Sequence, residues 1–282
     1  MTLQQRIKDG LDGKFTGLAN GFERINKYIF GIQRSTNYLI GGMSGTYKTT
    51  IVDFMLLNAI EDAKKKEIKL HVFYYSYEID KITKQCNWVS VLVYYKYGVI
   101  IPPERIKGLG DNRLSAEERL MVDDCTPELE EMFKEINFEF IPNNPTGIYY
   151  QIWKFFEDRG TLVREAIENP GEGPSTKIVK YIPNNTNEQV LVVMDHVYCL
   201  KKERGFGVKE VLDKYSEYCI QLKNMFGVSF INIQQFNDGL NAVERQKYKG
   251  VDLSPSMQDF KDTRNLYQDS DIVLGIMNPY KL

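Results

Sequence analysis

The chain has 282 residues, of which 43% are hydrophobic, 26% charged and 12% aromatic. This length accommodates one large α/β domain or two small ones, and the apolar content excludes disorder as the main state. No apolar run approaches the roughly 20 residues that a membrane-spanning helix needs, and the N-terminus lacks the apolar segment of a secretion signal. We therefore expect a cytoplasmic protein without a membrane partner.

Charge and cysteine content narrow the function classes further. The 36 basic and 38 acidic side chains nearly balance, which argues against a chain coated in nucleic acid but permits a local basic channel. The cysteines lie far apart, in neither CxxC nor Cys/His ligand spacing, so we expect reduced thiols instead of a zinc site. They are Cys86, Cys125, Cys199 and Cys219.

In chain order, residues 1–15 predict a short polar linker helix, and residues 16–282 form one further unit without repeats. Short, almost continuously apolar segments predict strands buried on both faces of a parallel sheet. These are Asn37–Ile40, Leu70–Tyr75, Phe138–Ile141, Val190–Met194, Val228–Ile233 and Asp271–Ile276. Helical patterns lie between them at Thr49–Lys66, Lys81–Tyr97, Thr146–Arg159 and Val208–Phe226. Strand–helix alternation predicts a three-layer α/β domain with a mostly parallel sheet, and residues 98–135 predict helices packed outside it.

A glycine-rich segment, GGMSGTYKTT, follows the first strand and precedes an amphipathic helix. Backbone N–H groups of such a loop wrap phosphate oxygens, and the helix N-terminus adds partial positive charge. In this pattern Lys48 reaches the β- and γ-phosphates of ATP, and the Thr49 hydroxyl ligates Mg²⁺. The candidate nucleotide-binding residues are Gly42, Ser44, Gly45, Thr46, Tyr47, Lys48, Thr49 and Thr50.

One position departs from the G-x-x-x-x-G-K-[ST] pattern over Gly42–Thr49, because Tyr47 stands at the second glycine. A Cβ atom there is expected to crowd the loop or to force another path, and Gly45 supplies some of the lost freedom. The alternative is a glycine-rich turn that caps a helix and leaves Lys48 solvated.

Polar residues stand at the ends of three predicted strands, where parallel sheets bind their ligands. Glu78 follows VFYYSY, Asp195 follows VLVVM, and Gln234 and Gln235 follow FINI. Phosphoryl transfer needs a carboxylate to orient the attacking water, an aspartate for the metal and an amide at the γ-phosphate. The alternatives are a helix-capping acid for Glu78, a turn residue for Asp195 and an ordinary polar strand end for Gln235. His196 is interpreted as a packing residue, with catalysis as the lesser alternative.

The combined pattern resembles the hexameric replicative helicases of the DnaB type, which are RecA-like ATPases, from about Gly17 onward. GFERINKYIFGIQR resembles that family's entry segment, SYEID its Ser-Leu-Glu-Met segment, MDHVYCL its Walker B strand and IQQFND its Ser-Gln-Leu-Asn-Arg segment. The resemblance implies that Glu78 is the catalytic glutamate, that Asp195 holds Mg²⁺ and that Gln235 senses the γ-phosphate.

The segment MQDFKDTRNLYQDSDIVLGI resembles the family element that lines the central channel and grips DNA. The resemblance implies DNA contacts for Lys261, Asp262 and Arg264. Basic residues on two predicted channel loops join this candidate set: Lys201, Lys202, Arg204, Arg245, Lys247 and Lys249. Such loops hold the nucleic-acid backbone without reading its sequence. The alternative is that KKER and ERQKYK are ordinary solvated surface.

The chain also departs from the family beyond Tyr47. Asp238 stands where the family has arginine, and Arg264 replaces a glycine. The family's arginine finger lies beyond the last matched strand and its primase-binding collar precedes the match, so residues 16–282 are expected to form a RecA-like domain that is incomplete at its C-terminal end.

We therefore expect an ATP- and Mg²⁺-dependent single-stranded DNA translocase that forms a homo-hexameric ring, in a bacterial or phage-infected cell, with primase or a loader as further partners. Two alternatives stay open at this point. One is a recombinase or loader of the same superfamily, which forms filaments. The other is a nucleotide-binding assembly protein that has lost turnover.

Overall fold

The computed structural model describes residues 2–11, 17–109, 113–167, 175–237, 254–260 and 264–278. Its centre is a six-stranded sheet in the order β3-β2-β6-β7-β1-β8, in which every pair of neighbours is parallel. The strands are β1 (Asn37–Gly42), β2 (Lys69–Ser76), β3 (Ile136–Glu139), β6 (Glu188–Asp195), β7 (Ser229–Gln235) and β8 (Ile272–Ile276).

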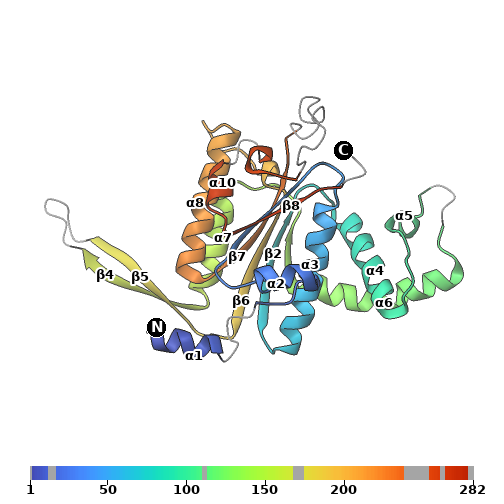
Figure 1. Ribbon diagram of the computed structural model, residues 1–282, viewed down its shortest axis with the longest axis horizontal. Coiled ribbons are helices and arrows are strands. Elements are labelled where there is room, and N and C mark those ends of the chain that lie inside the picture. Colours follow the sequence, from blue (N-terminus) through green and yellow to red (C-terminus); the bar gives the residue numbers. More distant parts are fainter. Residues whose placement is uncertain are drawn as a thin grey trace.

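Helices cover both faces of this sheet (Figure 1). One face carries α7 (Pro145–Glu157) and α8 (Val208–Phe226), and the other carries α3 (Lys48–Lys65), α4 (Lys81–Tyr97) and α6 (Ala116–Glu135). The shorter helices are α1 (Leu3–Leu11), α2 (Glu23–Ile29), α5 (Pro103–Ile106), α10 (Arg264–Gln268) and the 3₁₀ turns η1 (Val197–Cys199) and η3 (Met257–Asp259). The predicted three-layer α/β architecture is confirmed, and so are the helices between residues 98 and 135.

Two hydrophobic cores lie on opposite faces of the sheet, and β6 contributes to both. Leu191 and Val193 join the core beneath α3, α4 and α6, whereas Val192 and Met194 join the core beneath α7 and α8. Successive side chains of a strand point to opposite faces, so a strand that is buried on both sides must be apolar throughout. This explains why the run VLVVM was recognisable as a central strand.

Several element boundaries differ from those predicted. β3 begins two residues earlier than expected, and Ile141, which the prediction placed inside it, is exposed. β1 extends through Gly41 and Gly42, which pair with Gln234 and Gln235 of β7. The two glycines that were assigned to the loop therefore belong to the end of β1, and the two glutamines lie at a strand end, as predicted.

A long hairpin was not predicted at all. β4 (Gly160–Ile167) and β5 (Ser175–Pro183) pair antiparallel as a separate two-stranded sheet, which projects from the domain as an arm (Figure 1). Charged residues interrupt both strands, and the register shifts after Val163, so neither strand has a regular alternation of apolar and polar side chains.

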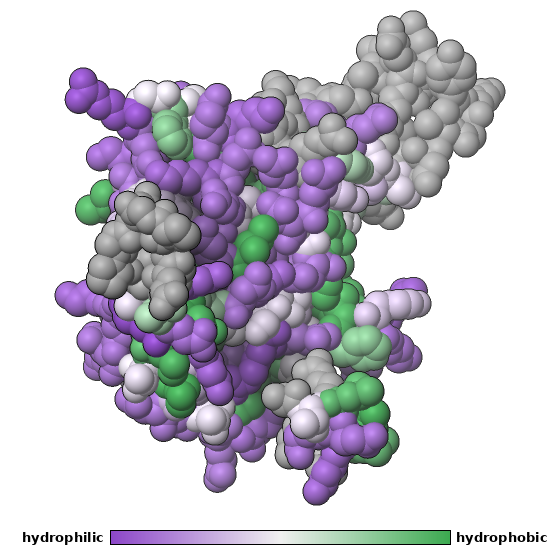
Figure 2. Space-filling view, turned by 90° about the vertical axis from the view of Figure 1, so that its left-hand side faces the viewer, coloured by the Kyte–Doolittle hydropathy of each residue, from purple (hydrophilic) through white to green (hydrophobic). Residues whose placement is uncertain are grey.

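The described surface is polar over most of the face on the α8 side, where apolar residues form only small, scattered patches (Figure 2). No helix within the described ranges is long and apolar enough to cross a bilayer. All four cysteines are free thiols, as their spacing indicated. The N-terminal helix is present as α1, and its role as a linker stays a prediction.

Candidate nucleotide-binding site

The segment between β1 and α3 is a tight turn whose donors converge on one carbonyl. The Met43 carbonyl accepts hydrogen bonds from Thr46 Oγ1 at 2.8 Å and from Lys48 Nζ at 2.8 Å. A Cβ atom on Gly42 would lie 2.6 Å from Thr46 Oγ1 and 3.0 Å from the backbone oxygen of Ile276, so a larger residue would displace the turn. The turn therefore holds the Lys48 ammonium at the N-terminus of an 18-residue helix, where backbone N–H groups and the helix dipole favour an anion.

Tyr47, which replaces the second glycine of the motif, adopts the conformation that a glycine would adopt. Its φ and ψ are 63° and 27°, in the left-handed region, and Gly45 also has a positive φ of 70°. The side chain is 66% exposed, so it points into solvent and does not crowd the turn. The expected crowding is thus absent, because the backbone of Tyr47 bears the strain of the tight turn.

Two carboxylates influence the half-buried Lys48 ammonium. Burial lowers the pKa of Lys48, while the negative charges of Glu78 and Asp195 raise it. Glu78 follows β2 and Asp195 ends β6, and these two strands are neighbours in the sheet. The structure thus brings together Lys48 of the glycine-rich segment and two carboxylates that the sequence placed at separate strand ends.

Asp195 ends β6 in a fully buried position, and its carboxylate meets the first turn of α3. Thr49 Oγ1 lies 3.1 Å from Asp195 Oδ1 and 3.0 Å from Oδ2. Burial raises the pKa of Asp195 to about 6, although the Lys84 ammonium and the Thr49 hydroxyl both act to lower it. Asp195 is therefore not a simple turn residue, because it is buried and its carboxylate contacts α3.

Glu78 lies in the turn after β2, with its side chain 56% exposed. The N-cap of α4 is Asp80, whose carboxylate accepts a hydrogen bond from the Thr83 N–H at 3.0 Å, so Glu78 is not the capping residue. Glu78 Oε2 instead lies 3.8 Å from His196 Nε2. Burial lowers the pKa of His196, and the Glu78 charge opposes that effect.

The two glutamines occupy different environments at the end of β7. Gln235 pairs with Gly42 in the sheet register, which places it beside the glycine-rich turn, and it is half-buried. Gln234 is fully buried, and its Nε2 lies 3.4 Å from the Tyr198 hydroxyl. Only Gln235 of this pair is open to a ligand, as the sensor assignment requires.

Behind Asp195 lies a buried ionic cluster that was not predicted. Lys84 of α4 is fully buried, and its Nζ donates to both carboxylate oxygens of Asp53 at 3.1 Å and to the Tyr74 hydroxyl at 2.8 Å. The same ammonium lies 3.8 Å from Asp195 Oδ2. Asp53 lies one helical turn after Thr49 on α3, so both side chains face the sheet. This spacing is the sign of a polar contact near Thr49 that the sequence contains.

The donor set fits a divalent cation bound together with a nucleotide. Within the described ranges no three His, Cys, Asp or Glu side chains form a self-sufficient metal site. The Thr49 hydroxyl and the Asp195 carboxylate lie 3.0 Å apart, about the separation of two ligands of one small cation. Mg²⁺ typically completes its coordination shell with phosphate oxygens and water. Thr49 and Asp195 are the residues here that suit such a shared cation.

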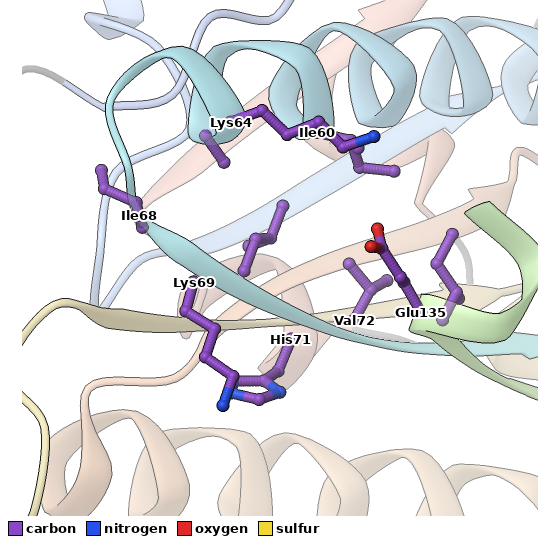
Figure 3. Close-up of a pocket in the computed structure, with 10 residues that line it drawn as sticks. Ile60, Lys64, Ile68, Lys69, His71, Val72 and Glu135 are labelled. Atoms are coloured by element: carbon purple, nitrogen blue, oxygen red, sulfur yellow. The ribbon is translucent and has the colours of Figure 1, made fainter. Parts of the chain in front are cut away.

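A separate cavity of about 320 Å³ lies at the other end of β2 (Figure 3). Ile60, Ile68 and Val72 line it, while Lys69 and His71 point to the side of the strand away from α3. It sits at the amino end of β2, whereas Glu78 follows the carboxyl end of that strand. The cavity is therefore distinct from the candidate nucleotide site.

The candidate DNA-binding residues are only partly described. Lys261, Asp262, Arg245, Lys247 and Lys249 lie outside the described residues, as does Asp238. Arg264 begins α10, and its side chain is outside the described part. Lys201, Lys202 and Arg204 lie between η1 and α8, and all three are exposed.

The beginning of the predicted DNA-gripping element is anchored to the end of β7. Asp259 is buried and accepts from the Ser256 N–H at 2.6 Å, and its carbonyl accepts from the Asn237 N–H at 2.9 Å. The Phe260 ring packs against Phe236, with ring centroids 4.8 Å apart. The segment is thereby fixed beside the strand that ends in Gln235.

No family model and no curated protein matches the sequence. Among solved structures, one described as an ATPase domain is similar with a TM-score of 0.68 at 15% identity, over 98% of this chain and 84% of that chain. A DnaB-like replicative helicase, in a structure described with its interactions with primase, is similar with a TM-score of 0.67 at 17% identity, over 99% of this chain. The chain spans only 56% of that helicase. At these identities the likeness establishes the fold alone, and the predicted RecA-like fold is confirmed.

Proposed function

We propose that this chain is the ATPase domain of an ATP-driven single-stranded DNA translocase, a helicase motor that works as a homo-hexameric ring. The observation that carries the proposal is the meeting of the Thr49 hydroxyl and the Asp195 carboxylate at 3.0 Å, on the sheet edge that also holds Lys48 and Glu78. A chain with a glycine-rich turn that merely caps a helix has no need of a buried aspartate at that distance.

In this proposal each residue has a defined task. The amides of Ser44–Lys48 and the Lys48 ammonium bind the phosphates, with Gly42 permitting the tight turn and Thr50 in the first turn of α3. Thr49 and Asp195 hold Mg²⁺, which neutralises charge on the phosphates when bound. Glu78 orients and deprotonates the attacking water, and Gln235 contacts the γ-phosphate. The exposure of Glu78 suits a base that must meet water, while the buried Asp195 suits a ligand.

The conformation of Tyr47 supports turnover over the alternative of a nucleotide-binding protein that has lost activity. That alternative drew its support from the missing glycine. Because Tyr47 takes the left-handed conformation with its side chain in solvent, the turn follows a path that a glycine would also permit.

The DNA and assembly parts of the proposal rest on the fold likeness and on the residue pattern. The similar structures are an ATPase domain and a DnaB-like replicative helicase described with its interactions with primase. We extend to this chain single-stranded DNA as the substrate, together with self-assembly as a ring, primase or a loader as partner, and a cytoplasmic location. The residues proposed to hold the DNA are Lys261, Asp262, Arg264, Arg245, Lys247 and Lys249.

ATP turnover with and without single-stranded DNA tests the proposal. Lys48→Ala is expected to abolish ATP binding, because the loop amides alone do not replace the lost charge. Glu78→Gln is expected to bind ATP while its turnover falls by about 10²-fold or more. Glu130→Gln, at an exposed position on α6, is the matched control and should behave as the wild type.

Two results would contradict this assignment. Unchanged ATP affinity in Lys48→Ala would remove the phosphate loop from the site. Turnover that survives Glu78→Gln but is lost in His196→Ala would transfer the role of base to His196. Electron microscopy with an ATP analogue and DNA distinguishes the ring from the filament of a recombinase.

A further inference from the structure

The cluster of Asp53, Tyr74 and Lys84 has an organisation that simple packing does not require. Its members come from α3, β2 and α4, and all three side chains are at most 5% exposed. Burying an ammonium and a carboxylate costs several kcal/mol per ion, and well-packed apolar residues of similar volume are often at least as stable. The cluster therefore calls for an explanation beyond filling the core.

The ammonium of Lys84 is shared between two carboxylates of unequal distance. It lies at hydrogen-bonding distance, 3.1 Å, from Asp53, and at 3.8 Å from Asp195 Oδ2, which is an ion pair without a direct hydrogen bond. The Tyr74 hydroxyl donates to Asp53 Oδ1 at 2.7 Å and accepts from Lys84 at 2.8 Å. Asp53 and Tyr74 thus fix the position of the cation, and the cation faces Asp195.

The same arrangement joins the parts of the candidate site. Asp195 meets Thr49, one turn before Asp53 on α3, and Lys84 belongs to the helix that follows the Glu78 turn. A carboxylate that ligates a metal is usually oriented by a hydrogen-bonded or charged partner behind it. Lys84 occupies that place relative to Asp195.

We propose that Lys84 is a positioning residue that acts through Asp195, holding this carboxylate in the orientation in which it and the Thr49 hydroxyl receive a divalent cation together with a nucleotide. The inference rests on the proposed ATPase function and adds a residue to it. Lys84 touches neither nucleotide nor metal in this scheme. Its effect is on how much Mg²⁺ strengthens ATP binding.

The test uses the full chain and compares ATP affinity by calorimetry with Mg²⁺ and with EDTA. The central variant is Asp53→Asn with Lys84→Met, which removes the hydrogen-bonded pair of charges together, so that neither Asp53 nor Lys84 is left as a lone buried ion, while Asp195 keeps its contact with the Thr49 hydroxyl. We expect its unfolding midpoint in urea to stay near that of the wild type and its affinity for ATP in EDTA to be unchanged. The strengthening of ATP binding by Mg²⁺ should fall by about 10-fold or more.

Two further variants keep the test decisive. Tyr74→Phe removes one partner of the Lys84 ammonium without changing the volume, and it should show a smaller loss in the same direction if the double variant fails to fold. Lys81→Met removes the same charge from an exposed position on the same helix and should match the wild type.

The outcomes separate this inference from the proposed function. If the wild type binds ATP and the double variant and Tyr74→Phe keep the full effect of Mg²⁺, Lys84 is only the structural partner of Asp53 and the inference is wrong. If the wild type binds no ATP under either condition, the proposed function is wrong, and the inference that rests on it is wrong as well.

Discussion

The carboxyl edge of the central sheet and the β4–β5 arm are held together in opposite ways. At the edge, residues from different strands and helices meet in buried positions, as Thr49, Lys84 and Asp195 do. In the arm, two neighbouring strands pair with each other, and residues such as Glu165 and Lys177 face one another in solvent.

The comparison shows which substitutions should change the free energy of unfolding most. A charge buried without its partner is expensive, whereas an exposed cross-strand ion pair contributes little. The arm depends on its base, where Tyr181 and Phe226 pack edge to face with ring centroids 5.0 Å apart. Substitutions at the sheet edge should therefore have large effects, and those along the arm small ones.

The largest effect is expected when the buried cluster loses one member. Asp53→Asn leaves the Lys84 ammonium buried without its hydrogen-bonded counterion, and the free energy of unfolding should fall by about 3–5 kcal/mol. Glu165→Gln in the arm is the contrasting variant, with a change of at most about 0.5 kcal/mol. Urea denaturation at pH 7 measures both. Equal effects in the two variants would remove the distinction between the regions.

The pH dependence of stability sharpens the comparison, because Asp195 is buried and the carboxylates of the arm are not. Burial raises the pKa of Asp195 to about 6, whereas an aspartate in an unfolded chain titrates near pH 4. Between these values the folded protein keeps a proton that the unfolded chain has released, so stability falls as pH rises. Over roughly two pH units this amounts to about 3 kcal/mol.

Urea denaturation of the nucleotide-free protein in EDTA, from about pH 4 to about pH 7, measures this slope. Asp195→Asn removes the titrating group, so its stability should decline less than that of the wild type across the window, while Glu165→Gln should follow the wild type. An identical slope in wild type and Asp195→Asn would show that Asp195 titrates normally.

At the base of the arm, unlike along its length, a substitution should lower the free energy of unfolding clearly, as a substitution at the sheet edge does. The rings of Phe156 and Phe226 stack with centroids 4.4 Å apart, and Tyr181 of β5 packs against both. Phe226→Ala should lower the free energy of unfolding by about 2 kcal/mol, since Phe226 is only half-buried, and should accelerate proteolysis within the arm. Val179→Ala, exposed on the arm, should change stability by less than about 0.5 kcal/mol. A mild effect of Phe226→Ala would show that the hairpin holds itself together.

The sequence predicted the sheet edge well because one physical rule governs it. Buried parallel strands are apolar throughout, and their carboxyl ends meet at one edge, so a polar residue after such a run marks a site. Glu78, Asp195 and Gln235 were found in this way, and the structure places them around one phosphate loop. Their catalytic roles stay predictions.

The sequence could not predict features that depend on partners far apart along the chain. Asp53 and Lys84 each look like the polar face of an amphipathic helix, and only the packing of α3 and α4 on β2 brings their charges together. The arm was missed for another reason, because its strands mix polar and apolar residues without the regular alternation that marks a strand in a sequence.

The smallest expected effect concerns Tyr47, where sequence and structure disagree on the outcome of a missing glycine. A left-handed φ costs a non-glycine residue about 1–2 kcal/mol. Glycine avoids this cost, but its greater conformational freedom in the unfolded chain offsets about 0.5–1 kcal/mol of the gain. Tyr47→Gly should therefore raise the free energy of unfolding by about 0.5–1 kcal/mol.

Tyr47→Ala keeps the Cβ atom and should show no gain, which makes it the control for the loss of the ring. ATP affinity should stay within about 3-fold of the wild type in both variants, since the side chain is exposed and the backbone of the turn is unchanged. A loss of affinity shared by both variants would place the Tyr47 ring against the nucleotide. A loss of stability in Tyr47→Gly would mean that the ring supports the turn.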